Sequence, residues 1–357
     1  MAATTTARKQ RSRSEASMTS AEGSTASAEG STASDTAGVI KAYVWSPDGN
    51  VAEVDSLDHI QRAFADPDTR LWIDLEDASQ GTLESIAGCL ELHHLIVEDI
   101  VERNQRAKVE YTDETMHLVL FALQYDGELM TAELDIVLGE RFLLTSHPPA
   151  WRPTETPNIR RNGVGHFLDH GVDHMLWAVV DAAIDGYFPV FDRLGDEIDD
   201  LQDDVLRRPS SRIVERVFQV RRDLLTIRHA VSPEREVFNQ LTNRENPLIH
   251  PDRIIYFRDV YDHLIRLTDE LDSFREQVGT TLDAYLSTVN NNLSEVMKRL
   301  TAVTAVLAGA GAVAGIFGMS EAGLALSLTD PRFWVVTIAI LVGAVAGFAY
   351  FRRIGWI

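Results

Sequence analysis

The sequence predicts an α/β domain followed by long α-helices, of which the last two are apolar enough to cross a membrane. Three observations support this fold class. Strand-like and helical patterns alternate over residues 39–150, and helical periodicity dominates from residue 151 onward. Two uncharged apolar segments then lie at the C-terminal end of the 357-residue chain. This length suggests two or three structural units.

The composition narrows the class of function. The chain has 54 Asp and Glu residues against 33 Lys and Arg, which gives a formal net charge of −21. Such a surface repels the phosphates of nucleic acids, so we expect no nucleic-acid partner, and it is compatible with divalent cations. The single cysteine, Cys89, excludes a disulfide framework and any metal site built from cysteines, and we expect it to be buried on a helix.

The first 38 residues differ from the rest of the chain. Residues 1–38 are rich in Ser, Thr, Ala, Gly and Glu and contain a tandem repeat of AEGSTAS, so we predict a disordered tail. In residues 39–150, strand-like runs surround one predicted helical stretch from Thr82 to Glu102, which indicates a cytosolic α/β domain. The strand-like runs are IKAYVW, LWIDL, HLVLFALQY, ELDIVL and FLLTS.

Residues 151–251 are predicted to form a helical hairpin region. An amphipathic segment from Val172 to Leu206 ends in the acidic run FDRLGDEIDDLQDDV, and the segment from Arg212 to Ala230 is basic. The sequence Pro-Ser-Ser at 209–211 supplies a turn and a helix cap between them. We expect an antiparallel hairpin with opposed acidic and basic faces. A low-affinity surface that attracts cations is compatible with this arrangement.

Three histidines are candidates for a separate metal site. His166, His170 and His174 are spaced four residues apart, which would form a zinc- or cobalt-binding face on a continuous helix. Gly165 and Gly171 argue against a continuous helix there. A solvated helix start is the favoured interpretation, and metal binding stays open as the alternative.

The next helix is unusually long. No proline interrupts residues 252–320, and apolar residues recur from Phe257 to Leu300 at an average spacing of about 3.6 residues. A helix of this length extends about 100 Å. Its apolar stripe needs other helices to pack against, which predicts an oligomer.

Two segments have the length of a membrane span. Residues 300–320 and 333–351 carry no charge, and each is about 30 Å long as a helix, the thickness of a bilayer core. Basic residues flank the outer ends of the pair, so both termini are predicted to lie in the cytoplasm. Residues 321–332 then form a short external loop, and residues 352–357 a basic cytosolic C-terminus. These features predict a multi-pass protein of the cell membrane, in contact with lipid.

Both spans contain a GxxxG motif. The motifs are Gly311–Gly315 and Gly343–Gly347, and such small residues allow helix backbones to approach closely. We interpret them as helix-packing sites. Two spans cannot enclose a pore, so transport would require several copies of the chain.

The sequence resembles the CorA family of divalent-cation channels over roughly residues 39–357. The resemblance is carried by HHLIVEDIVERNQRAKVEY, YFRDVYDHL, LDAYLSTVNNNLSEVMKRLT, GIFGMS and the terminal YFRRIGWI. It implies a funnel-shaped homopentamer in which the long helix lines a pore for Mg²⁺ and a second span lies outside it. Co²⁺ or Ni²⁺ would be further cargo. No enzyme signature such as GxxxxGK[ST] or HExxH is present in the sequence.

The match departs from the family at the pore mouth. Gly318, Met319 and Ser320 occupy the positions of the family's Gly-Met-Asn signature, and Ser294 and Gly311 stand where the family has larger polar residues. A ring of serine hydroxyls reaches less far than a ring of amides. We therefore expect altered selectivity with the pore retained. The alternative is that Ser320 is an ordinary residue at a helix end.

The resemblance also assigns the remaining pore residues. Met297 and Leu300 match a hydrophobic constriction, which would gate by dewetting. Asp283 matches a ring of carboxylates that would concentrate cations, and Asn291 matches a position beside the lumen. The alternative for the two apolar residues is helix packing.

A regulatory metal site follows from the same resemblance. Asp99 and Asp259 match positions that meet across a subunit boundary, and Glu98 lies beside Asp99. Two carboxylates about 4 Å apart repel by about 4 kcal/mol at an effective dielectric constant of 20. Bound Mg²⁺ would cancel this repulsion and hold the pore closed. The alternative is that each aspartate caps a helix or forms a salt bridge.

Two rival functions remain. One is a zinc transporter of the same superfamily, with the same topology and Zn²⁺ as cargo. The other is a non-conducting sensor of divalent cations, in which the serine variant of the signature has abolished selective transport.

Overall fold

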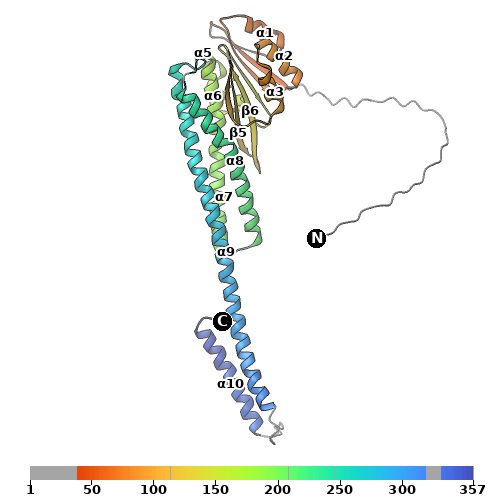
Figure 1. Ribbon diagram of the computed structural model, residues 1–357, viewed down its shortest axis with the longest axis vertical. Helices are drawn as coiled ribbons and strands as arrows, with labels where there is room; N and C mark the ends of the chain where they lie inside the picture. The colour runs from red at the N-terminus through yellow and green to blue at the C-terminus, as the bar shows by residue number, and fades with distance from the viewer. Residues whose placement is uncertain (1–37, 113, 208, 245, 319–330, 357) are drawn as a thin grey trace, which may run out of the picture. The chain divides into compact units, whose positions relative to one another are not determined.

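The computed structural model describes residues 38–112, 114–207, 209–244, 246–318 and 331–356 (Figure 1). In this part of the chain, a seven-stranded sheet has the order β2-β1-β3-β7-β6-β5-β4. The central strands β3 and β7 run parallel, and all other neighbours are antiparallel. The strands are β1 (Val39–Trp45), β2 (Val51–Val54), β3 (Arg70–Glu76), β4 (Lys108–Tyr111), β5 (Met116–Tyr125), β6 (Leu129–Leu138) and β7 (Phe142–His147).

Helices cover both faces of the sheet. Along β3, Trp72 packs into one buried cluster and the next residue, Ile73, into the other, because successive side chains of a strand point to opposite faces. The cluster around Ile73 contains α1 (Leu57–Ala65), α2 (Gln80–Leu90) and α3 (His94–Glu102). The cluster around Trp72 contains α5 (Val164–His170) and α6 (Val172–Asp185). The predicted α/β domain is thereby confirmed.

The single helix predicted from Thr82 to Glu102 is wrong, because two helices occupy this segment. The chain leaves α2 at Glu91 in the left-handed conformation (φ 57°), and His93 caps α3 by accepting a hydrogen bond from the Leu95 N–H at 3.3 Å. Cys89 lies on α2 as expected, but it is only partly buried. The short elements α1, β2 and β4 were not predicted.

The segment from Val172 to Leu206 is also two helices, α6 and α7 (Tyr187–Arg207). Pro189 explains the break, because its ring would clash with the carbonyl of Asp185 in a continuous helix. Pro189 also has no N–H to donate to that carbonyl. Gly186 sits between the helices, where an added Cβ would lie 3.3 Å from the Leu123 carbonyl oxygen of β5. The missing side chain therefore lets the helix junction pack closely on the sheet.

The predicted hairpin is formed by α7 and α8 (Ser211–Asn243). The basic helix continues beyond Ala230, through Pro233, for another 13 residues. Between the two helices, Arg216 donates to Glu197 at 2.9 Å and to Asp204 at 2.7 Å. In the described part of the chain, the salt bridges between the acidic and basic segments therefore all involve Arg216.

Helix α9 (Ile254–Gly318) runs continuously over 65 residues (Figure 1). Its N-terminal half is buried against α6, α7 and α8 by an apolar stripe. The buried residues of this stripe are Phe257, Val260, Leu264, Leu267, Leu271, Phe274 and Val278. Beyond Leu282 the same stripe is exposed, with Leu293 58% exposed and Val296 59% exposed.

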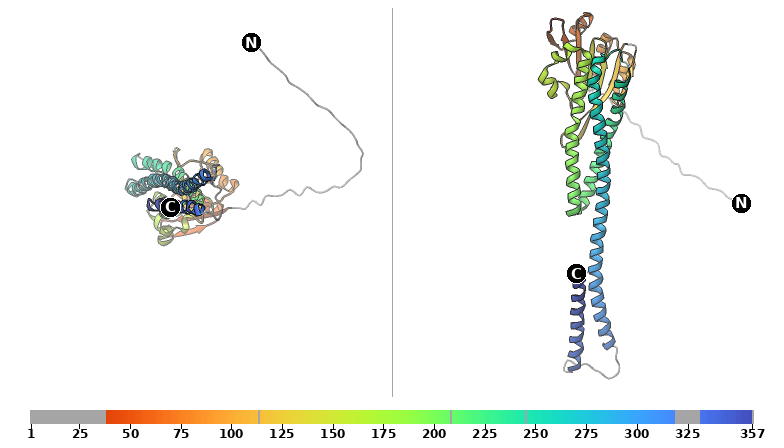
Figure 2. Two further views of the ribbon diagram at one scale, coloured as in Figure 1. Left: turned by 90° about the horizontal axis from the view of Figure 1, so that it is seen from below. Right: turned by 90° about the vertical axis from the view of Figure 1, so that its left-hand side faces the viewer.

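Helix α10 (Pro331–Arg353) packs beside the C-terminal half of α9 (Figure 2). Both helices are long and apolar enough to cross a membrane. Within the single chain, 6% or less of the apolar segment of each helix is buried. Gly347 makes a close contact, since an added Cβ there would lie 3.3 Å from Val306. At Gly311, Gly315 and Gly343 the corresponding space is open.

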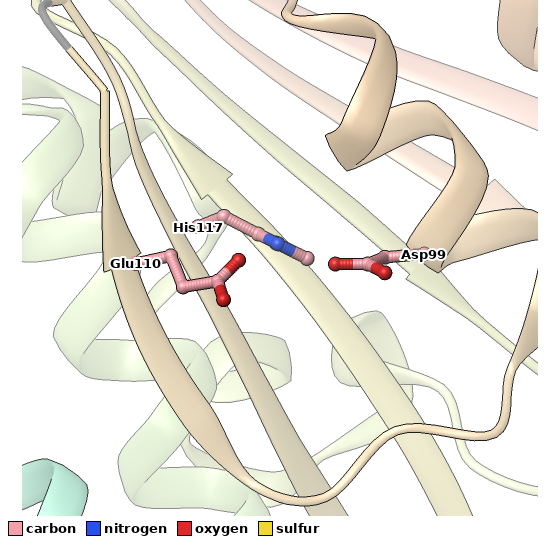
Figure 3. Close-up of side chains that lie close together, drawn as sticks. All are labelled: Asp99, Glu110 and His117. Atoms are coloured by element: carbon pink, nitrogen blue, oxygen red, sulfur yellow. The ribbon is translucent and has the colours of Figure 1, made fainter.

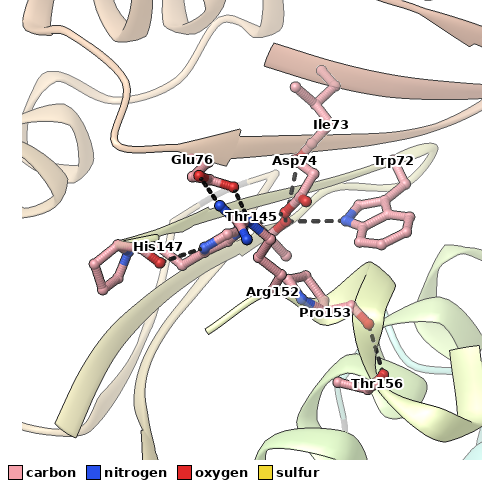
Figure 4. Close-up of polar contacts among 10 residues, drawn as sticks. Trp72, Ile73, Asp74, Glu76, Thr145, His147, Arg152, Pro153 and Thr156 are labelled. Carbon is pink, nitrogen blue, oxygen red and sulfur yellow. Dashed lines mark hydrogen bonds and ion pairs between the residues drawn. The ribbon is translucent and has the colours of Figure 1, made fainter. Parts of the chain in front are cut away.

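A polar seam joins the sheet to the helical region (Figure 4). At the C-terminal ends of β3 and β7, Asp74 accepts hydrogen bonds from Thr145 at 2.5 Å and from His147 at 3.1 Å. Arg152 binds both carboxylate oxygens of Glu76, at 2.5 and 2.6 Å, just before the short helices η1 (Pro153–Glu155) and α4 (Pro157–Asn162). These contacts fix where the chain leaves the sheet.

Candidate functional site

Asp99 lies on the last turn of α3 and faces β4. The ammonium of Lys108 is 2.6 Å from its Oδ2 and 3.1 Å from Oε2 of Glu110. Asp99 and Lys108 are 20% and 25% exposed at their side chains, whereas Glu110 is 55% exposed. The sequence alternative of a salt-bridged Asp99 is therefore realised within the single chain.

His117 completes a group of possible metal ligands at this place (Figure 3). Ligand atoms of Asp99, Glu110 and His117 all lie within 4.8 Å of one another. His117 is buried on β5 and bonds to Asp135 through Nε2 at 3.0 Å, while its Nδ1 has no partner in the described structure. Neither Glu110 nor His117 was predicted, because their approach to Asp99 depends on the register of β4 against β5.

The surroundings of Asp99 are strongly acidic. Glu133 on β6 is half-buried, and burial followed by the charge of Asp135 raises its pKa to about 7. Asp99 contributes to the same shift, and the Gln105 N–H opposes it by donating to Glu133. A cation at this place therefore meets more negative charge than Asp99 alone supplies.

Asp259 lies beside a second cluster, between α6 and α9. It is exposed on the N-terminal part of α9, and its carboxylate lies 4.0 Å from His263 one turn later. Ligand atoms of His263, Asp181 and Asp185 lie within 4.8 Å of one another. Both pairs have a spacing of four residues, which places each on one helix face. That spacing is the signal in the sequence that could have found Asp181, Asp185 and His263.

The carboxylates of this second cluster repel one another. Burial, followed by the charge of Asp185, raises the pKa of Asp181 to about 6, and Asp259 adds to the shift. Burial also raises the pKa of Asp185, where His263 opposes the effect and Asp259 adds to it. The raised pKa values show that these carboxylates gain from a nearby positive charge, and together with the imidazole they form a donor set for a divalent cation.

Asp99 and Asp259 do not share a ligand group within the described chain, and their meeting across a subunit boundary stays a prediction. Glu98 is exposed and lines an open pocket of about 610 Å³ between α2 and α3. That pocket is also lined by Glu84, Glu91 and Glu102.

The predicted pore residues lie on α9, and each is exposed in the single chain. Asp283, Ser294 and Met297 are separated by 11 and 3 residues, close to whole turns, so they share a face of the helix. Asn291, Leu300 and Gly311 lie on flanking faces. Gly318 is the last residue of α9, and Met319 and Ser320 lie outside the described residues.

The three histidines occupy two helices, which Gly171 separates with a φ of 131°. The expectation of solvated side chains is wrong for His174, which is 6% exposed and stacks on Trp177 at 5.0 Å between ring centroids. Burial lowers its pKa to about 4. The rings of His166 and His170 lie nearby, but the nitrogens of the three do not converge as a ligand group among the described residues.

Comparison with known proteins gives a consistent set of relatives. A family model described as CorA-like Mg²⁺ transporter protein matches residues 68–353. The cobalt/magnesium transport protein CorA of Thermotoga maritima is 32% identical over 299 residues, which cover 82% of this chain and 85% of that protein. 

Solved structures resemble this chain in fold. The CorA magnesium transporter from Methanocaldococcus jannaschii has a TM-score of 0.76 at 22% identity, covering 89% of this chain and 99% of its own. The ZntB cytoplasmic domain from Vibrio parahaemolyticus has a TM-score of 0.57 at 14% identity, covering 71% and 99%.

Proposed function

The chain belongs to the family of CorA-like Mg²⁺ transporter proteins, and from this premise we propose that it forms a homopentameric channel for the entry of Mg²⁺. Members of this family transport divalent cations and are not enzymes. Co²⁺ and Ni²⁺ are proposed as further cargo, since the relative from Thermotoga maritima is named a cobalt/magnesium transport protein. The observation that carries the proposal is the pair of carboxylate clusters around Asp99 and Asp259, combined with two exposed apolar helices.

The proposed conduction path runs along α9. Five copies of Asp283 would concentrate cations at the cytosolic end, and Ser294 and Asn291 would offer oxygens to hydrated ions. Met297 and Leu300 would form the constriction, and their 52% and 58% exposure in the single chain leaves them free to face a pore. Gly311 and the mouth residues Gly318, Met319 and Ser320 would follow.

The mouth is proposed to hold a hydrated ion. Mg²⁺ gives up its water reluctantly, so oxygens that accept hydrogen bonds from bound water suit it better than direct ligands. Serine in place of the family's asparagine shortens the reach of this ring. We therefore propose a weaker preference among divalent cations at this mouth.

Closure is proposed to depend on Mg²⁺ bound between subunits. Without it, Asp99 of one copy and Asp259 of the next would repel and loosen the interface. The donor sets fit the ion, since Mg²⁺ prefers oxygen ligands and both aspartates lie beside further carboxylates. Glu98 would add charge next to Asp99, while Asp181 and Asp185 would add it next to Asp259.

The proposed topology keeps most of the chain in the cytosol. Residues 39–150 and 151–251 form the cytosolic α/β and helical regions, and residues 252–320 the pore helix, with a span at 300–320. A short external loop at 321–332 leads to the second span at 333–351, and residues 352–357 return to the cytosol. Both termini lie in the cytoplasm and the two spans contact lipid in the plasma membrane of a prokaryote.

A zinc transporter is the second candidate. The specific observation that favours it is His263 beside Asp181 and Asp185, because an imidazole with two carboxylates is a donor set that Zn²⁺ accepts. A non-conducting sensor would use the same clusters without passing ions.

Uptake into dye-loaded liposomes tests these proposals. The purified full-length protein is compared in Mg²⁺, Co²⁺, Ni²⁺ and Zn²⁺, with and without Mg²⁺ preloaded on the cytosolic side. Saturable Mg²⁺ influx that preloading suppresses is the expected result. Flux of Zn²⁺ alone would favour the zinc transporter, and folded, oligomeric protein that passes none of the four ions would favour the sensor.

A further inference from the structure

Lys108 occupies the place beside Asp99 that the proposed regulatory cation would take. Its ammonium lies between two carboxylates, 2.6 Å from Asp99 and 3.1 Å from Glu110. Asp99 and Lys108 are both partly buried, so their attraction is stronger than that of a fully exposed pair. The same carboxylates belong to the group whose ligand atoms lie within 4.8 Å of one another.

The cluster needs a cation even when no metal is bound. Besides Asp99 and Glu110, strand β6, on the far side of β5, brings the half-buried carboxyl of Glu133 and the buried carboxyl of Asp135, which bonds to His117. The other nearby cation, Arg103, donates to Asp77 at 2.9 Å and is therefore engaged elsewhere. Lys108 is thus the cation that reaches Asp99 in the described structure.

We propose that Lys108 is a tethered competitor of the divalent cation at Asp99, so that it sets how much cytosolic Mg²⁺ is needed to close the channel. This inference rests on the proposed regulatory role of Asp99. With little Mg²⁺ present, the ammonium holds the Asp99 oxygen. Binding of Mg²⁺ requires that the ammonium leave, which lowers the apparent affinity of the site.

The geometry provides a place for the displaced lysine. Glu110 is two residues further along β4, is 55% exposed, and already accepts from the same ammonium. The lysine stem has four rotatable carbons, so a small swing keeps Glu110 as a partner while Asp99 is released. The exchange therefore replaces one cation by another at Asp99 without leaving a bare ammonium.

Full-length protein in detergent allows this to be measured without flux. Mg²⁺ is titrated and the midpoint of protection from limited proteolysis is recorded for the wild type and for Lys108→Met, which keeps a stem of similar length without the charge. We expect the midpoint to fall by about five- to tenfold, as for the loss of a partly buried competing charge. Lys41→Met, which removes the same charge from β1 of the same domain, should leave the midpoint within about twofold.

The outcomes separate the two proposals. If the wild type shows Mg²⁺-dependent protection and Lys108→Met has an unchanged or higher midpoint, Lys108 is only a structural salt bridge. If the wild type shows no Mg²⁺-dependent protection, the regulatory role of Asp99 itself is overturned. Lys108→Arg is a second variant, for the case that the methionine variant does not fold. Arginine keeps the positive charge and can bind Asp99 through two N–H groups, so the midpoint of this variant should not fall. A lower midpoint for arginine would overturn the competition.

Discussion

Glu234 on α8 is fully buried, and its hydrogen bonds determine its protonation state. The Phe121 N–H donates to its Oε1 at 2.7 Å, and the Tyr187 hydroxyl lies 2.8 Å from both its Oε2 and the Phe121 carbonyl. The single hydroxyl proton cannot serve both acceptors at once, and a proton on the Glu234 carboxyl would supply the second donor. Burial raises the pKa of Glu234 to about 8, in agreement with a neutral carboxyl at pH 7.

This ring of hydrogen bonds attaches the helices to the sheet. The pairing of β4 with β5 ends at Val119, so the backbone of Phe121 has no strand partner on that side. Glu234 and Tyr187 take its N–H and carbonyl instead. Because the carboxyl of an unfolded chain has a pKa near 4.5, the folded state binds one more proton between pH 4.5 and 8.

Glu234→Gln should remove this pH dependence. In the wild type, the contribution of Glu234 to the free energy of unfolding is greatest below pH 4.5, the pKa of this carboxyl in the unfolded chain. It falls by about 1 kcal/mol per pH unit until the pH passes about 8, the pKa of the carboxyl in the folded chain. A glutamine amide makes the same donor and acceptor contacts without a proton. Thermal unfolding from pH 5 to 8 should therefore show the variant gaining on the wild type as pH rises. The exposed neighbour Glu236→Gln is the control, and parallel curves for Glu234→Gln and the wild type would contradict the neutral carboxyl.

Asp259 supports a second prediction at the level of single residues. Asp259→Lys places a positive charge beside Asp181 and Asp185 and opposite the proposed position of Asp99 in the next copy. The fixed ammonium replaces the regulatory cation, so liposome flux should become insensitive to Mg²⁺ on the cytosolic side. Asp262→Lys on the same helix is the charge-matched control. Flux of the Asp259 variant that millimolar Mg²⁺ still shuts off would remove this residue from the gate.

At the scale of elements, helix breaks were the weakest part of the sequence interpretation. Amphipathic periodicity continues across the junction of α6 and α7, although Pro189 interrupts the hydrogen bonds there. The sequence does not indicate the break between α2 and α3, where Glu91 has a left-handed conformation. Glycine is the residue that usually marks such a position, and glutamate rarely adopts this conformation. The first break could have been predicted from the proline, whereas the second depends on how α3 packs on the sheet.

The two glycines of the second GxxxG motif have different surroundings. Gly347 is in close contact with Val306, whereas Gly343, one turn away, has open space around its Cα. Gly347→Leu should therefore push α10 from α9 and lower stability by about 1–3 kcal/mol, as overpacking does. Gly343→Leu is the matched control. Equal unfolding temperatures for the two variants in detergent would show that Gly347 does not join the helices.

At the scale of the whole molecule, the unpaired half of the α9 stripe is the main feature. More than half of the surface is exposed at Leu286, Leu293 and Val296, although these residues continue the helical period of the buried residues in the N-terminal half of α9. An apolar stripe of this length is stable in water only against other helices, which favours an assembly.

Native mass spectrometry in detergent checks the size of that assembly. We expect a particle of five chains of 39.8 kDa each. Leu293→Asp would place a charge in the stripe and should shift the particle to smaller species, while Asn290→Asp on the same helix should leave it intact. A wild-type particle with another number of chains would overturn the pentamer.

The fold class, the two apolar segments and the family could be predicted from the sequence. These features rest on local patterns: the period of apolar residues, the absence of charge over the length of a bilayer, and short motifs in a definite order along the chain. It also named Asp99 and Asp259, but through a resemblance and without their neighbours.

The groups that surround those aspartates could be identified only from the three-dimensional structure. Lys108 reaches Asp99 because β4 joins the edge of the sheet beside α3, and Asp181 and Asp185 reach His263 because α6 packs against α9. Lys108 and Asp99 are only 9 residues apart, whereas α6 and His263 are distant in the sequence, but in both cases the distances between the side chains follow from packing and strand register. The charge state of Glu234 could not be predicted from the sequence for the same reason, since burial and its hydrogen bonds with Phe121 and Tyr187 decide it together.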